Sequence, residues 1–107
     1  MLQTITRIPV AHYSNVKMRS GYSIKIDNKE IAIFKLTNGK VYAIEDRSPH
    51  PKGGVLSEGL ISGEYVYCPV YDWKISLADG KVQAPDEGQV RTFKVELEND
   101  IIFIILE

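Results

Sequence analysis

The stretch GYSIKIDNKEIAIFKLTNGKVYAIE (residues 21–45) decides the fold of this 107-residue chain. Apolar and polar side chains alternate around Ile24 and Ile26, and they alternate again at the end of the stretch. A period of two predicts half-buried β-strands. Asp27-Asn28-Lys29 and Thr37-Asn38-Gly39-Lys40 lie between the strands and supply the Asn, Asp and Gly residues that hairpin turns need.

The same signals continue along the rest of the chain. Residues 31–36 and 101–106 are apolar on both parities, so we expect central strands covered on both faces. Shorter alternating stretches predict strands at residues 65–67, 73–77 and 93–97, with turns at 78–81 and 98–100. No amphipathic helix longer than a short turn is apparent. We therefore predict an all-β fold, a small sandwich or barrel of short antiparallel strands.

Composition bounds the possible functions. The length indicates one domain, residues 1–107, and the 13 basic and 14 acidic residues are spread evenly, which argues against nucleic-acid binding. No apolar run approaches the ~20 residues of a membrane helix, and the N-terminus does not read as a signal peptide. The single cysteine, Cys68, excludes an internal disulfide and fits a reducing cytoplasm.

Irregular segments interrupt the strand pattern at residues 46–60, 68–72 and 83–89. They suggest a loop subdomain, about residues 45–82, inserted in a basal β scaffold. Long loops on a β scaffold are where binding and catalytic residues concentrate. His50 and Cys68, both able to bind soft metals, lie in these loops.

The spacing of these residues resembles a known ligand pattern. Ser48-x-His50 is followed by seventeen residues and then by Cys68-x-x-Tyr71. In Rieske iron–sulfur domains the pattern is Cys-x-His and Cys-x-x-His, in which two cysteines hold one iron and two histidines hold the other. The flanking residues 48–54 and 68–74 are similar to that family too, and the resemblance covers roughly residues 20–106. It implies a Rieske-type fold with two loops in a cluster-like subdomain.

The departures from this pattern matter more than the matches. Ser48 stands where the family has its first cysteine, and Tyr71 stands where it has its second histidine. Each iron would lose one ligand, and a serine hydroxyl is a hard, weakly acidic donor that is a poor substitute for thiolate. We therefore predict that the four positions Ser48, His50, Cys68 and Tyr71 hold no cluster and no metal, and we expect no catalytic residue in this chain.

A scaffold that has lost its cluster resembles one family in particular, the small subunit of the cytoplasmic, assimilatory NAD(P)H-dependent nitrite reductase. The residues that carry this resemblance are Leu56-Ser57-Glu58-Gly59, Tyr67-Cys68-Pro69 and Asp72-Trp73-Lys74-Ile75. It implies a non-redox subunit that binds and supports a large subunit. In that family the large subunit carries flavin, an iron–sulfur cluster and sirohaem, and reduces nitrite to ammonium.

Other functions remain open from the residues alone. One alternative is a small Rieske-type ferredoxin, an electron carrier with atypical ligands. Another is a β-module with a thiol activity from a Cys68–His50 pair. A zinc site completed by Asp46 or Asp72 falls short of four good ligands.

In the cluster-free hypothesis the loops must keep their shape without metal. We expect apolar filling and hydrogen bonding by the following residues: Val55, Leu56, Val70 and Tyr71 as filling, and Ser48 and Asp72 as hydrogen-bonding groups. We also expect Trp73 to belong to the core rather than to stack on a ligand.

Overall fold

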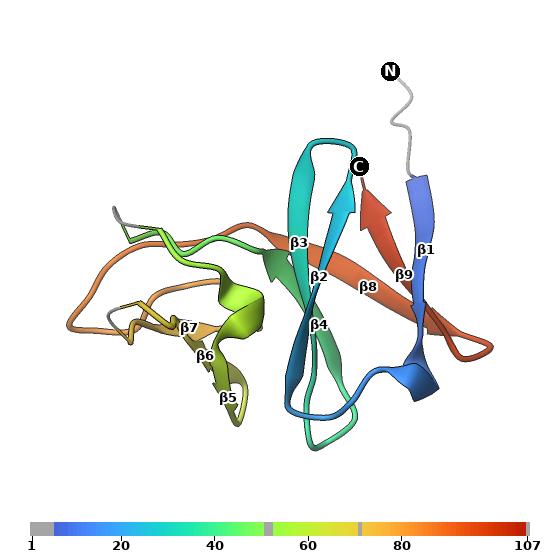
Figure 1. Cartoon of the computed structure of the whole chain (residues 1–107), viewed down its shortest axis with the longest axis horizontal. Coiled ribbons are helices and arrows are strands. Elements are labelled where there is room, and N and C mark those ends of the chain that lie inside the picture. Colours follow the sequence, from blue (N-terminus) through green and yellow to red (C-terminus); the bar gives the residue numbers. More distant parts are fainter. Residues whose placement is uncertain (1–5, 51–52, 71, 107) are drawn as a thin grey trace.

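The computed structural model describes residues 6–50, 53–70 and 72–106, and these form two antiparallel sheets (Figure 1). The larger sheet has the order β1-β9-β8-β4-β3-β2. Its strands are β1 (Thr6–His12), β2 (Ser20–Ile26), β3 (Lys29–Lys35), β4 (Val41–Glu45), β8 (Thr92–Glu98) and β9 (Ile101–Leu106). The smaller sheet comprises β5 (Leu60–Ser62), β6 (Tyr65–Tyr67) and β7 (Lys74–Ser76). The described helical segments are the 3-10 turns η1 (Tyr13–Asn15) and η2 (Leu56–Glu58), and no described helix is long and apolar enough to span a bilayer.

The all-β prediction is confirmed, and two strands were missed. β1 carries Pro9 and a register shift between Pro9 and Ala11, and it pairs only with β9, so its sequence lacks a clean alternation. β5 has three residues, and its Leu60 was wrongly assigned to the first loop. Strands this short leave too few residues for a period to be recognised.

The predicted turns are confirmed by backbone geometry. Each of the four turn segments contains a residue with positive φ: Asp27, Gly39, Gly80 and Asn99. Asp, Asn and Gly tolerate this left-handed conformation better than other residues do. Local turn chemistry was therefore a reliable guide to where strands end.

Strand β3 is buried on both faces because it belongs to two core clusters. Its odd residues, Ile31 and Ile33, pack with Ala43, Phe93 and Ile104 on the inner side of the curled sheet. Its even residues, Ala32 and Phe34, pack on the other side against a cluster that includes residues of η2 and the small sheet. The expectation for residues 31–36 is confirmed. β9 also lies between two strands, although three of its residues are only partly buried.

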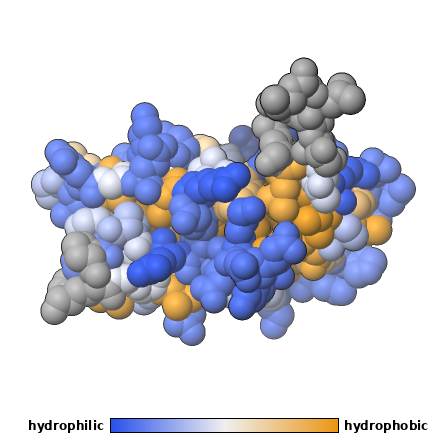
Figure 2. Space-filling view, turned by 90° about the horizontal axis from the view of Figure 1, so that it is seen from above, coloured by the Kyte–Doolittle hydropathy of each residue, from blue (hydrophilic) through white to orange (hydrophobic). Residues whose placement is uncertain are grey.

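The large sheet curls so that its two edge strands, β1 and β2, approach each other (Figure 1). A hollow between them is lined by Ile8, Val10, Ile24 and Ile26, among others. Figure 2 shows apolar side chains exposed on this side, next to a band of hydrophilic ones. The small sheet and the loops lie at the other end of the molecule, between β4 and β8 in sequence (Figure 1).

Candidate functional site

The first loop is tied down at its start by a buried carboxylate. Asp46 is 3% exposed, and its two carboxylate oxygens accept hydrogen bonds from the backbone N–H of Ser57 (2.7 Å) and the hydroxyl of Ser57 (2.9 Å). The backbone N–H of Asp46 donates to the carbonyl of Glu30 in β3. These bonds join the loop to η2 and to the large sheet. Asp46 is therefore occupied in holding structure, not in completing a zinc site.

Ser48 caps a turn inside this loop, as expected. Its side chain is buried, and its Oγ accepts a hydrogen bond from the backbone N–H of His50 at 3.2 Å. Its own backbone N–H donates to the carbonyl of Gly54 at 2.9 Å, and the N–H of Gly53 donates to the carbonyl of His50. The loop thus folds back on itself through its own backbone.

The second loop places Cys68 in the core. The side chain is fully buried and belongs to the same cluster as Val66 and Ile75. Its backbone N–H donates to the carbonyl of Trp73, and its Sγ lies 3.9 Å from the carbonyl oxygen of Gly53. A catalytic thiol needs a partly exposed and electropositive setting, which a fully buried cysteine lacks. The burial of Cys68 argues against the thiol-activity alternative.

The two loops meet at Gly54. A Cβ built on this residue would lie 2.9 Å from the Sγ of Cys68, 3.5 Å from the Cγ2 of Val70 and 3.6 Å from the Cβ of Ser48. Its φ of 128° also favours glycine. Ser48 and Cys68, two positions of the Rieske ligand pattern that the sequence resembles, therefore lie on either side of Gly54. The backbone of the first loop fills the space between them.

His50 and Trp73 join the loops a second time. Their ring centroids lie 4.7 Å apart in a T-shaped arrangement with an interplanar angle of 72°. Trp73 is half-buried and packs against the core cluster, as predicted. His50 is half-buried and has further contacts of its own. The histidine of the expected ligand set is thus held against an aromatic ring of the opposite loop.

The expectation about apolar filling is only partly correct. Leu56 is fully buried, but Val55 and Val70 are 44% and 36% exposed. Val70 contacts Gly54 while remaining partly exposed, so neither valine is enclosed as filling between the loops. Asp72 is exposed with a positive φ, and no side-chain hydrogen bond is found for it among the described residues. Tyr71 lies outside the described residues.

The residues at these positions do not fit a two-iron cluster. A Rieske centre takes two thiolates and two imidazoles, whereas the described positions offer one of each and a serine hydroxyl that binds backbone. The single thiol is packed against the Gly54 backbone. Within the part of the chain that the structure describes, no three His, Cys, Asp or Glu residues lie close enough to share a metal ion.

Exposed apolar side chains gather around the two loops. Of the five large apolar residues that are exposed in the described part of the chain, three lie here: Val55, Leu60 and Val70. Val70 reaches Gly54, the neighbour of Val55, and Leu60 is 72% exposed beside Pro69 in a shared hollow. We call Val55, Leu60, Pro69 and Val70 the tip patch. The sequence did not predict that these residues, which come from a strand and two loops, lie near one another.

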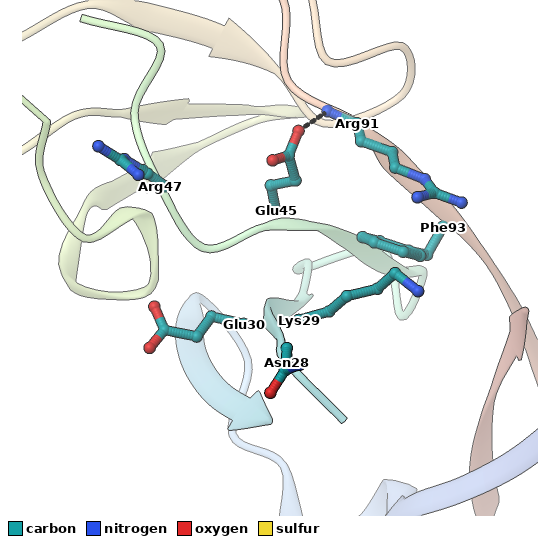
Figure 3. Close-up of a pocket in the computed structure, with 7 residues that line it drawn as sticks. All are labelled: Asn28, Lys29, Glu30, Glu45, Arg47, Arg91 and Phe93. Carbon is teal, nitrogen blue, oxygen red and sulfur yellow. Dashed lines mark hydrogen bonds between the residues drawn. The ribbon is translucent and has the colours of Figure 1, made fainter. Parts of the chain in front are cut away.

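A second feature beside the first loop was missed by the sequence prediction. A hollow of about 260 Å³ is lined by three basic side chains, Lys29, Arg47 and Arg91, with Glu45 and Phe93 among its other residues (Figure 3). We call it the basic hollow. The sequence did hold a signal for it in the alternation of side chains along a strand. Lys29 and Arg91 each stand two residues before a buried residue, so each is expected on the same face as that residue.

Comparison with known proteins identifies relatives. Residues 7–105 match the model of the Rieske-like [2Fe-2S] domain family. The chain is 30% identical over 93 residues to the NAD(P)H nitrite reductase large subunit of Klebsiella oxytoca, covering 83% of this chain and 10% of that protein. It is 36% identical over 89 residues to the NAD(P)H nitrite reductase of Emericella nidulans, covering 76% of this chain and 8% of that protein. The chain therefore spans about a tenth of the length of these relatives.

Two further proteins match this chain over most of their length, one in sequence and one in fold. The 3-phenylpropionate/cinnamic acid dioxygenase ferredoxin subunit of Shigella boydii is 31% identical over 88 residues, covering 80% of this chain and 82% of that protein. A structure described provisionally as the NADH-dependent nitrite reductase small subunit of Mycobacterium tuberculosis superposes with a TM-score of 0.88 at 19% identity. It covers 98% of both chains and shows the shared fold.

Proposed function

This chain belongs to the Rieske-like [2Fe-2S] domain family, and on that premise we propose that it is the cluster-free small subunit of a cytoplasmic NAD(P)H-dependent assimilatory nitrite reductase. In this role it binds and supports the large subunit, which reduces nitrite to ammonium with its own flavin, iron–sulfur cluster and sirohaem. The chain itself performs no chemistry and holds no cofactor.

Two observations support this proposal over the other members of the family. The chain is homologous to the Rieske-like part of nitrite reductases, with 30% and 36% identity in the matches above. In addition, the serine hydroxyl at position 48 is turned to the backbone and the Cys68 thiol is packed in the core, so neither is presented to a metal.

The observation that carries the proposed role is the tip patch. In a cluster-bearing Rieske domain the loop tips are where the partner approaches the cluster. Here the same end of the molecule exposes Val55, Leu60 and Val70, and exposed apolar patches mark binding surfaces. A standard interface buries about 800 Å² per partner, which the two loops and the flank of β5 can supply.

The described parts of the two loops are held by contacts that need no metal. The Asp46–Ser57 bonds fix the base of the first loop, and the Ser48–Gly54 bond closes it. Contact of Gly54 with Cys68 joins it to the second loop. A surface that is ordered before binding loses less conformational entropy on association.

The first test is binding to the large subunit of a sirohaem nitrite reductase encoded in the same organism. We expect co-expression to give a stoichiometric complex, and we expect Leu60→Asp and Val70→Asp each to weaken it at least tenfold. Leu97→Asp is the matched control, because Leu97 is 53% exposed but belongs to β8 and lines a hollow with residues of β4 and the turn before it. The assignment would be wrong if the large subunit did not bind this chain and if its nitrite-reducing activity were the same with and without the chain.

A second candidate is a Rieske-type ferredoxin with atypical ligands. The similarity to a dioxygenase ferredoxin subunit over four-fifths of both chains favours it. The two functions are separated by iron and sulfide analysis of protein purified without oxygen from a host with full cluster assembly. Stoichiometric iron with visible absorption would make the chain an electron carrier, whereas a colourless protein supports the cluster-free subunit.

A further inference from the structure

Two cations of the basic hollow stand on the rim of one core cluster. Lys29 opens β3 two residues before Ile31, and Arg91 lies just before β8, two residues before Phe93. Because side chains alternate across a strand, each cation faces the same side as the buried residue that follows it. Ile31 and Phe93 share a core cluster, and the Cζ of Arg91 lies 5.1 Å from the centroid of the Phe93 ring. Figure 3 shows Lys29 and Arg91 extending toward the same side of the hollow.

Two carboxylates, those of Glu30 and Glu45, also line the basic hollow, so its three cations exceed its acidic side chains by one. Glu45 accepts a hydrogen bond from the backbone N–H of Arg91, so its carboxylate is directed to the backbone (Figure 3). Glu30 also lines the hollow, and Figure 3 shows its carboxylate pointing away from the charged ends of Lys29 and Arg91. Glu30 stands opposite Lys25 of β2 in the strand register, where opposite charges stabilise a pair.

The ion pairs found among the described residues involve no side chain of the basic hollow. They join Arg7 to Glu96 and Glu98, at 2.9 and 2.8 Å. Lys29, Arg47 and Arg91 therefore form no ion pair within the described chain. Neighbouring like charges repel, and a bound anion would relieve that repulsion.

The size and position of the basic hollow indicate what kind of anion it takes. Its volume of about 260 Å³ is below the roughly 300–1,000 Å³ of sites for cofactors and drug-sized ligands. A side-chain carboxylate fits such a space. The hollow also shares Glu45 and Arg47 with a neighbouring hollow that is lined by Ser48, Pro49 and His50 of the first loop. A protein seated on the first loop thus reaches the basic hollow without a gap.

We propose that the basic hollow receives the carboxylate of an aspartate or glutamate side chain of the large subunit, an inference that rests on the proposed function. Lys29 supplies N–H donors from the start of β3 and Arg91 supplies them from the residue before β8, and Arg47 adds positive charge at the side nearest the first loop. The tip patch and the basic hollow then act as two parts of one docking surface, one apolar and one charged. Such charged contacts give specificity and register to an interface.

The test is charge reversal with a matched control on the same strand. We expect Lys29→Glu and Arg91→Glu each to raise the dissociation constant for the large subunit at least tenfold at about 50 mM salt, and less at about 500 mM salt, where charges are screened. Lys94→Glu makes the same charge change on β8, but Lys94 is exposed on the face opposite to Phe93. We expect Lys94→Glu to bind within twofold of the wild type.

The outcomes separate this inference from the proposed function. A wild-type chain that does not bind the large subunit makes the proposed function wrong. A wild type that binds, together with Lys29→Glu and Arg91→Glu variants that bind equally well, overturns the inference alone. Equal weakening by Lys94→Glu also overturns it, because the effect would then follow net charge rather than the basic hollow. Both residues are exposed, so unchanged urea unfolding curves show that the variants fold.

Discussion

Ser48 and Cys68 occupy two of the four positions that hold the cluster in the Rieske pattern. Both side chains are buried, and each is used by the protein itself: the hydroxyl accepts the N–H of His50, and the thiol packs in the core cluster. The sequence predicted that these residue types form a poor ligand set. That the backbone at Gly54 lies against the thiol depends on loop geometry and could not be predicted from the spacing.

Asp46 is a residue whose role the sequence did not predict. The sequence offered Asp46 only as a completing ligand of a zinc site that falls short of four good ligands, whereas both of its carboxylate oxygens accept hydrogen bonds from Ser57. Hydrogen bonds to a charged group contribute about 1.5–3 kcal/mol each, so this contact is enough to anchor a loop. The partner is eleven residues away in the chain, across a segment with no periodicity to predict the contact.

Tyr42 links the large sheet to the small one. Its hydroxyl donates a hydrogen bond of 2.7 Å to the carboxylate of Glu64, in the turn between β5 and β6. That hydrogen bond, with smaller effects from partial burial and from the negative charge, raises the pKa of Tyr42 above its ordinary value of 10.0. The folded protein therefore holds the phenolic proton more tightly than the unfolded chain does. The stabilisation is full below pH 10 and is lost as the pH rises through the folded-state pKa.

Tyr42→Phe should remove this pH-dependent stabilisation. The pair is in contact with solvent, so we expect the wild type to be more stable than the variant by only about 0.5 kcal/mol near neutral pH. The difference should shrink as the pH rises above 10.0, where the unfolded chain loses the proton first. Urea unfolding of both proteins across this range measures it, and effects of other titrating groups cancel in the difference. Parallel stability curves would contradict the prediction.

At the level of elements, local sequence predicted most strands and correctly placed the turns at Asp27, Gly39, Gly80 and Asn99. The reason is that side-chain alternation and turn residues act over a few positions. Local sequence failed to predict β1 and β5, which are strands because they pair with a neighbouring strand. β1 is held by pairing with β9, at the other end of the chain, and β5 by pairing with β6 and by the burial of Ile61. Long-range pairing overrides weak local propensity in such cases.

Gly80, which follows the small sheet in the chain, contacts Val90 in the segment before β8. It has a φ of 75°, its carbonyl accepts the N–H of Val90, and a Cβ placed on it would clash with the carbonyl oxygen of Val90. Gly63 has a similar φ of 59°, but nothing lies within 4 Å of its Cβ position. The two glycines share a backbone conformation and differ in their surroundings.

Gly80→Ala should therefore destabilise the protein more than Gly63→Ala. We expect Gly63→Ala to cost about 1 kcal/mol from left-handed backbone strain alone. Gly80→Ala adds a backbone clash, and we expect a further loss of about 1–3 kcal/mol. The free energies of unfolding in urea measure both values. Equal losses would show that the contact between Gly80 and Val90 yields without cost.

At the scale of the whole molecule, two core clusters lie on opposite sides of β3, and each holds a different part of the structure together. One cluster closes the curled sheet, and the other holds the small sheet and the loops against it. The loops are thereby presented at one end of the molecule (Figure 1). The tip patch and the basic hollow lie on this loop-bearing side because β3, β4 and β8 all lead to it.

Restoring the missing ligands tests whether the scaffold still has the form of a Rieske domain. We expect the double substitution Ser48→Cys with Tyr71→His to bind stoichiometric iron and to absorb visible light after reconstitution with ferrous iron and sulfide. The reason is that it provides two thiolates and two imidazoles. The wild type and Ser48→Cys alone serve as controls and should stay colourless. A colourless double variant would show that the contact of Gly54 with Cys68, rather than ligand loss, closes the site.

The sequence alone determined that this chain is an all-β protein, that turns fall at four segments rich in Asn, Asp and Gly, and that its loops carry half of a ligand set. These properties are local, because they depend on side-chain alternation, on residues that accept left-handed backbone and on the identity of four positions. Only the tertiary structure decided that Gly54 lies against Cys68, that Val55 and Val70 stay partly exposed, and that Lys29 and Arg91 line one hollow. Each of these depends on strands or loops that are distant in sequence, and their contacts are fixed by packing rather than by any pattern in the chain.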